Sequence, residues 1–315
     1  MKASTANFIA YNLRPAKQTE RRLLLDFLSC AREEGIANSE YRYVGMGGTM
    51  FYDFHLIHRF LGISQMISLE RDKRMHPRSD FNCPYNFIAV KNETVANFLA
   101  NDRDDRVTIY WLDYDDGLGP DIAADITSLG TRLKIGGFAF VTVYAQPPGV
   151  LQKQRREQRL EYVQEHLGAF STSFTVADME NANFPNTVYR ILMAAFKNAF
   201  AARTDGAFHS LFRVQYKDSV EMMTVGGCFC SKAASPGFLR RVRTDLPFLS
   251  RGRPYKIRSL NLTDRERVLF DMAVTKQTLD SVQAKSLQSI GFKKGDFDAY
   301  RDLIRFLPRY HESII

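Results

Sequence analysis

The chain has 315 residues, and 43 Lys and Arg against 35 Asp and Glu give a formal net charge of +8. Hydrophobic residues make up 45% and charged residues 25%, which is typical of a globular protein with a sizeable core and excludes disorder and fibrous repeats. The best apolar run, residues 136–145, is half the roughly 20 residues of a membrane span, and residues 1–14 lack a signal-peptide pattern, so we expect a cytoplasmic protein with no membrane contact.

Apolar runs of strand length alternate with helical patterns through the first half of the chain. The predicted helices cover residues 19–34 (with Thr19 as its N-cap), 51–61, 95–100 and 122–133. The predicted strands cover residues 41–44, 65–69, 87–90, 107–112 and 138–144. This alternation predicts βαβ units and a parallel sheet covered by helices on both faces.

The pattern changes in the second half. Two helices are expected over 151–167 and 187–202, and two strands over 208–217 and 219–232 form a hairpin around a tight turn. We expect three parts: an α/β domain with its N-terminal helix over 1–235, a basic linker over 236–259, and a helical C-terminal region over 260–315.

Glycines and acids fall where the predicted strands end. The first strand runs into Gly45–Gly48 and then a helix, and such a turn presents free N–H groups to a polar or anionic ligand. Glu70 ends the second strand, Glu93 follows the third and Asp113 the fourth. Ligands of open α/β sheets bind at these strand ends, so together they predict a nucleoside-binding site.

Each feature also has a plainer interpretation. Glycine turns after strands are common, Glu70 begins a charged run that suits a solvated surface, and residues 113–116 suit a helix-capping loop. The coincidence of all of them at successive strand ends favours the site.

Residues 41–146 resemble the class I S-adenosylmethionine-dependent methyltransferases. The resemblance implies an α/β fold with a doubly wound, mainly parallel seven-stranded sheet and an antiparallel C-terminal hairpin, with S-adenosylmethionine as cofactor. It assigns Gly45, Met46 and Gly47 to the methionine part of the cofactor and Glu70 to the ribose. Asn92 and Glu93 would meet the adenine, and Asp113 would lead into the catalytic loop.

Three stretches, Leu13–Lys17, Tyr43–Gly47 and Trp111–Asp115, are similar to bacterial proteins assigned as O-methyltransferases. The chain departs from the wider class at Tyr43, where an acid is usual. The Asp/Asn/Ser-Pro-Pro-aromatic motif of amino-methyltransferases and the Pro-Cys motif of cytosine-C5 enzymes are both absent, so an oxygen acceptor is favoured over a base.

Other functional classes fit less well. The full GxGxxG pattern of dinucleotide binding is broken by Met50, and neither a P-loop nor a Gly-x-Ser-x-Gly elbow occurs. The six histidines form no metal-binding pattern, so no metal site is expected.

Methyl transfer to oxygen depends on positioning and benefits from a general base. Asp113 is the best candidate for the base or for orienting the acceptor. Tyr114 and Asp115 are the alternatives.

Most of the excess positive charge lies in residues 232–258, which hold eight basic residues against one acid, Asp245. Such clusters mark a polyanion partner, and we expect nucleic acid as the candidate partner. The candidate contacts are Arg240, Arg241, Arg243, Arg251 and Arg253. The same residues also suit a solvated linker or bridges between the core and the C-terminal helices.

Three hypotheses follow. The first is an S-adenosylmethionine-dependent methyltransferase, most simply an O-methyltransferase with nucleic acid among its candidate acceptors. The second is a catalytically silent Rossmann-like protein that binds a ligand in regulation or assembly, which Tyr43 favours. The third is a nucleic-acid-binding protein whose α/β core is only a scaffold.

Overall fold

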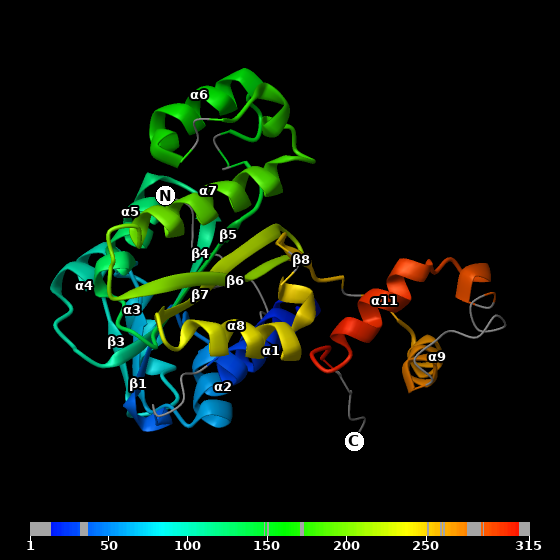
Figure 1. Cartoon of the computed structure of the whole chain (residues 1–315), viewed down its shortest axis with the longest axis horizontal. Coiled ribbons are helices and arrows are strands. Elements are labelled where there is room, and N and C mark those ends of the chain that lie inside the picture. The colour runs from blue at the N-terminus through cyan, green and yellow to red at the C-terminus, as the bar shows by residue number, and fades with distance from the viewer. Residues whose placement is uncertain are drawn as a thin grey trace.

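Eight strands form one sheet in the order β3-β2-β1-β4-β5-β7-β6-β8 (Figure 1). The structure is a computed structural model that describes residues 14–31, 37–147, 149, 151–170, 173–250, 252–258, 260, 262–275, 285 and 287–308. The strands are β1 (Tyr41–Gly45), β2 (Gln65–Leu69), β3 (Ile88–Lys91), β4 (Val107–Gly117), β5 (Phe138–Tyr144), β6 (Gly206–Lys217), β7 (Glu221–Ser231) and β8 (Tyr255–Lys256).

The directions of the strands in the sheet confirm the expected fold class. β1 to β5 are parallel, and β7 runs antiparallel to both β5 and β6. The chain moves outward from β1 to β3 and then returns to the other side of β1 with β4, so the strand order reverses between β1 and β4. β8 adds an eighth strand, parallel to β6, that the sequence did not predict.

Helices cover both faces of the sheet. The α-helices are α1 (Pro15–Ala31), α2 (Tyr52–Leu61), α3 (His76–Phe81), α4 (Val95–Asn101), α5 (Pro120–Arg132), α6 (Arg156–Leu167), α7 (Phe184–Ala199), α8 (Ser235–Asp245), α9 (Asp264–Thr275) and α11 (Lys294–Leu303). The short 3₁₀ helices are η3 (Asn38–Glu40), η4 (Gly168–Phe170), η5 (Val176–Met179) and η6 (Pro247–Ser250).

Strand alternation divides the apolar core into two layers. Tyr43 and Trp111 point into the layer beneath α1, α2 and α8. Their neighbours Val44 and Leu112 point into the layer beneath α4, α5 and α7. The strands are therefore buried on both faces, as the continuous apolar runs in the sequence predicted.

Helix α1 begins earlier than the sequence indicated. Its first residue is Pro15, a position that suits proline because the first N–H groups of a helix have no intrahelical partner. Thr19, the expected N-cap, lies inside the helix, and its hydroxyl donates to the Pro15 carbonyl at 2.7 Å. This shift brings Lys17 into the first turn.

In place of the expected basic linker over 236–259, the chain forms α8, η6 and β8. Pro236 and Gly237, which suggested a turn, occupy the first turn of α8. Phe238 and Val242 are buried against the core, and Val214 of β6 pairs with Tyr255 of β8. This segment belongs to the body of the α/β fold.

Helices α9 and α11 lie to one side of the sheet (Figure 1) and share a small apolar cluster around Phe270 and Tyr300. Two contacts tie the residues after α11 to α1. Arg305 pairs with Asp26 at 3.0 Å, and Arg22 donates to the Leu307 carbonyl at 2.9 Å. No described helix combines the length and apolarity that a membrane crossing requires.

Candidate functional site

The candidate site lies at the carboxyl ends of β1, β2 and β4, where the strand order reverses. Gly45, the last residue of β1, is in register with Ser68 of β2 and Trp111 of β4. Open α/β sheets bind ligands at this switch point because the neighbouring loops diverge there.

The loop after β1 holds its shape through close packing. A Cβ on Gly47 would lie 2.6 Å from the Phe51 ring, and the Gly47 amide donates to the Ser68 hydroxyl at 3.0 Å. Gly48 has φ +56°, a conformation that glycine adopts without cost. The half-buried Met46 packs beside the core beneath α4 and α5.

Two further features of this loop were not predicted. Phe51 is left-handed, with φ 50°, and such strain in a non-glycine residue concentrates at ligand-binding sites. The Thr49 hydroxyl is buried and has no hydrogen-bond partner in the described part of the chain. An unpaired buried hydroxyl is costly, so a ligand group that bonds to Thr49 would remove that cost.

A carboxylate does reach the end of β1, but α2 supplies it. The Tyr43 hydroxyl donates to Oδ2 of Asp53 at 2.5 Å. Burial, followed by the charge of Asp53, raises the pKa of Tyr43 well above its usual value. Burial also raises the pKa of Asp53, against the opposing charge of Arg21.

The ends of β2 and β3 are joined around Glu70. Its Oε1 accepts from the Asp72 amide at 2.8 Å, and its carbonyl accepts from Nδ2 of Asn92 at 2.7 Å. Burial raises the pKa of Glu70, and the negative charge of Asp115 adds to that rise. Glu93 is half-exposed and lies 3.6 Å from the ammonium of Lys91.

β4 continues past residue 112, where the sequence predicted its end, to Gly117, and it separates the three residues predicted to be catalytic. Asp113 keeps 30% of its side chain exposed on the α1 side, and Asp115 is exposed. The Tyr114 hydroxyl instead donates to Oδ2 of Asp125 at 2.6 Å. Burial raises the pKa of Tyr114 well above its usual value, so this hydroxyl has a structural partner away from Asp113.

Helix α1 contributes two charged residues that the sequence did not point to. Nζ of Lys17 lies 2.7 Å from Oδ2 of Asp113 and 2.8 Å from Oε2 of Glu20. Burial lowers the pKa of Lys17, but these two carboxylates outweigh burial and the net pKa is raised. Burial raises the pKa of Glu20. Only the similarity around Leu13–Lys17 drew attention to this segment.

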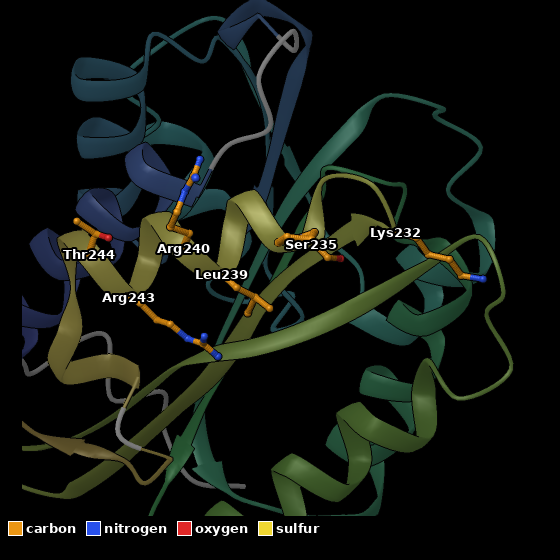
Figure 2. Close-up of a pocket in the computed structure, with 7 residues that line it drawn as sticks. Lys232, Ser235, Leu239, Arg240, Arg243 and Thr244 are labelled. Atoms are coloured by element: carbon orange, nitrogen blue, oxygen red, sulfur yellow. The ribbon is translucent and has the colours of Figure 1, made fainter.

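The basic residues around α8 take different roles. A shallow depression along α8 is lined by Lys232, Ser235, Pro236, Leu239, Arg240, Arg243 and Thr244 (Figure 2). Arg241 is not among them, and its Nε donates to the Cys30 carbonyl of α1 at 3.0 Å. Arg253 is exposed, and Arg251 lies outside the described residues.

Two histidines of α2 form hydrogen bonds with nearby residues. Nδ1 of His55 lies 3.0 Å from the Tyr85 hydroxyl, and Nδ1 of His58 lies 3.0 Å from the Ile63 carbonyl. Within the described ranges, no group of three or more His, Cys, Asp and Glu side chains is arranged to hold a metal ion.

Comparison with known proteins gives a match over nearly the whole chain. Residues 9–315 match the family described as "Putative O-methyltransferase". No curated protein sequence gives a significant match.

Solved structures give distant similarities. An O-methyltransferase from Bacillus cereus in complex with SAH has 13% identity and a TM-score of 0.40, covering 71% of this chain and 86% of that chain. The N-methyltransferase NodS from Bradyrhizobium japonicum, also with S-adenosyl-L-homocysteine, has 13% identity and a TM-score of 0.40, covering 70% and 90%. The O-methyltransferase TomG from Streptomyces achromogenes has 11% identity and a TM-score of 0.39, covering 67% and 79%.

Proposed function

The chain belongs to the family described as "Putative O-methyltransferase", and on this premise we propose that it transfers a methyl group from S-adenosylmethionine to an oxygen acceptor. The observation that carries the proposal is the placement of three features at the switch point of the sheet. These are the strained loop after β1, the fixed carboxylate of Glu70 and the partly exposed carboxylate of Asp113.

The residues at the strand ends fit the proposed cofactor. Gly45–Gly48 would hold its methionine part, with the unpaired Thr49 hydroxyl available as a donor or acceptor. Glu70 would accept from the ribose hydroxyls, and Asn92 with Glu93 would border the adenine. When bound, S-adenosylmethionine supplies a methyl group activated on a positively charged sulfur.

The protein's own contribution to the transfer is to position the acceptor and accept its proton. We assign this role to Asp113, since its carboxylate is the partly exposed member of a buried ionic cluster. Lys17 holds Oδ2, which directs the carboxylate and leaves Oδ1 for an acceptor hydroxyl. Tyr114 is left out of this assignment because its hydroxyl bonds to Asp125.

A labelled-methyl assay tests the assignment. The protein is incubated with tritiated S-adenosylmethionine and cell extract as the source of acceptors. Loss of a general base lowers rates by about 100-fold or more, so we expect Asp113→Asn to lose nearly all transfer. Asp105→Asn is the matched control, because Asp105 forms an exposed pair with Lys134. Equal labelling by the parent and Asp113→Asn would refute the role of Asp113.

We further propose that the acceptor, or a scaffold that carries it, is a nucleic acid docked along α8. Arg240, Arg243 and Lys232 line the depression there, and none of them forms an ion pair with another described residue. Cations that are not neutralised within the protein favour a phosphate backbone as their partner.

A catalytically silent binding protein is the alternative from a different functional class. The observation that favours it is Tyr43, where an acid is usual. Cofactor binding with no transfer to any extract would support this alternative.

A further inference from the structure

Lys17 connects two carboxylates that come from different elements. Its ammonium lies 2.8 Å from Glu20 on α1 and 2.7 Å from Asp113 on β4, and it donates to the Tyr216 hydroxyl at 3.0 Å. An ammonium carries one positive charge and three donors, and these three oxygens surround it, with Glu20 and Asp113 contacting it as ion pairs. The ammonium also lies 5.0 Å from the centroid of the Trp111 ring.

Hydrogen bonds fix this cluster to the sheet. The hydroxyl of Thr224 donates to Oε1 of Glu20, and the hydroxyls of Thr224 and Thr142 lie 2.8 Å apart. The indole N–H of Trp111 donates to Thr142 at 3.1 Å. Glu20 is therefore held at both oxygens, by Lys17 and by Thr224, and its distance from Asp113 is set by packing.

The charges of the cluster do not cancel. Lys17 contributes one positive charge, and Glu20 and Asp113 contribute one negative charge each. Lys17 and Glu20 have exposed side-chain fractions of 5% and 0%, while that of Asp113 is 30%. The surplus negative charge consequently faces outward through Asp113, in the C-terminal half of β4.

We propose that Lys17 and Glu20 are positioning residues that set the net charge Asp113 presents to the sulfonium of S-adenosylmethionine. This inference rests on the proposed function. A negative site favours the cationic methyl donor over its neutral demethylated product, S-adenosylhomocysteine, so the cluster would promote product release after transfer.

The test compares the affinities of the two compounds. For each variant, calorimetry gives the ratio of the dissociation constant of S-adenosylhomocysteine to that of S-adenosylmethionine. Emission from Trp111, the one tryptophan of the chain, gives a second reading beside the cluster. A unit charge acting through partly buried surroundings changes such a ratio by about fivefold, and this is the size we expect.

Charge alone predicts the order of the variants. Lys17→Met removes a positive charge, which makes the cluster more negative by one unit and raises the ratio of dissociation constants. Glu20→Gln removes a negative charge and lowers that ratio. The double variant Lys17→Met/Glu20→Gln has the parent's net charge, so its ratio returns to the parent value. Lys134→Met removes a lysine from an exposed pair with Asp105 and leaves the ratio unchanged.

A purely structural role gives a different result. Packing damage would weaken the binding of both compounds by the same factor, so the ratio of their dissociation constants would stay constant across the variants. That result would overturn the inference. If Lys17→Met does not fold, Glu20→Gln and the double variant still differ by one charge, and equal ratios would overturn the inference. If the parent binds neither compound, the proposed function fails, and the inference fails with it.

Discussion

Asp53 occupies an unusual position for a charged residue. Its carboxylate accepts from Tyr43 beneath the candidate cofactor loop, and burial raises its pKa. The chain thus places an acid near the end of β1 through the hydrogen bond of Tyr43 to Asp53, a residue of the following helix.

The raised pKa of Asp53 predicts that Asp53 lowers the free energy of unfolding by an amount that depends on pH. A carboxyl with a higher pKa in the folded state than in the unfolded state stabilises the fold at low pH, and this stabilisation is lost as pH rises through the folded pKa. Asn in its place still accepts from Tyr43 but carries no charge. We therefore expect the free energy of unfolding of Asp53→Asn, relative to the parent, to increase between about pH 3 and pH 7.

Urea unfolding of both proteins across that range measures this difference. A constant difference would show that the charge of Asp53 is not destabilising.

At the scale of elements, the sequence predicted the strand ends and turns that are determined by short runs of apolar and turn-forming residues. The ends of β1 at Gly45 and β2 at Leu69, and the β6–β7 hairpin, followed from apolar runs and turn residues, whereas β4 continues to Gly117, beyond the end expected at residue 112. Helix α8 was not predicted, because Pro236 and Gly237 suit a helix start as well as a turn. The eighth strand was not predicted, because its two residues are too few to show an alternating pattern.

The α1 cluster could not have been predicted from local pattern. Lys17 and Tyr216 are 199 positions apart, and their contact depends on how α1 packs beside β6. Lysine in an amphipathic helix usually indicates a solvated face. Only the assembled fold shows that this lysine is buried between two carboxylates.

Charge reversal on α8 tests the proposed nucleic-acid surface. We expect Arg240→Glu/Arg243→Glu to weaken binding of single-stranded RNA or DNA and to reduce the slope of log affinity against log salt by about 1.4 to 1.8, since two phosphate contacts are lost. Fluorescence anisotropy at several salt concentrations measures both quantities.

The control carries the same change in charge elsewhere. Lys153→Glu/Lys197→Glu alters two exposed lysines remote from α8 in the sequence and should retain the parent's affinity. If both double variants lose the same affinity for nucleic acid, the loss comes from the change in net charge, and the α8 surface is not the nucleic-acid site.

At the scale of the whole molecule, a buried ion pair that stabilises the fold and the candidate site lie at opposite ends of strand β1. Near the start of β1, the buried guanidinium of Arg42 bonds to both carboxylate oxygens of Asp102, at 2.9 and 2.5 Å. Burial raises the pKa of Asp102, but the hydrogen bonds and charge of Arg42 outweigh burial and lower it overall. This pair stabilises the fold without approaching the strand ends that bear the site.

Breaking this pair is expected to affect stability alone. Arg42→Met leaves Asp102 without its buried cation and costs about 3 kcal/mol of the free energy of unfolding. Because the folded pKa of Asp102 is lowered, the contribution of the pair is present above about pH 4 and is lost as pH falls further. Denaturant unfolding at pH 7 and near pH 3 would show this loss, and an equal cost at both pH values would contradict it.

Calorimetry with S-adenosylmethionine tests the central claim, which is that the strand ends of this chain hold that cofactor for methyl transfer. We expect one molecule to bind per chain and Glu70→Ala to weaken binding by about tenfold or more, since a charged hydrogen-bond acceptor is removed. Arg42→Met, measured where it remains folded, should bind as the parent does. Absence of binding at millimolar S-adenosylmethionine, or an unchanged affinity in Glu70→Ala, would contradict the account.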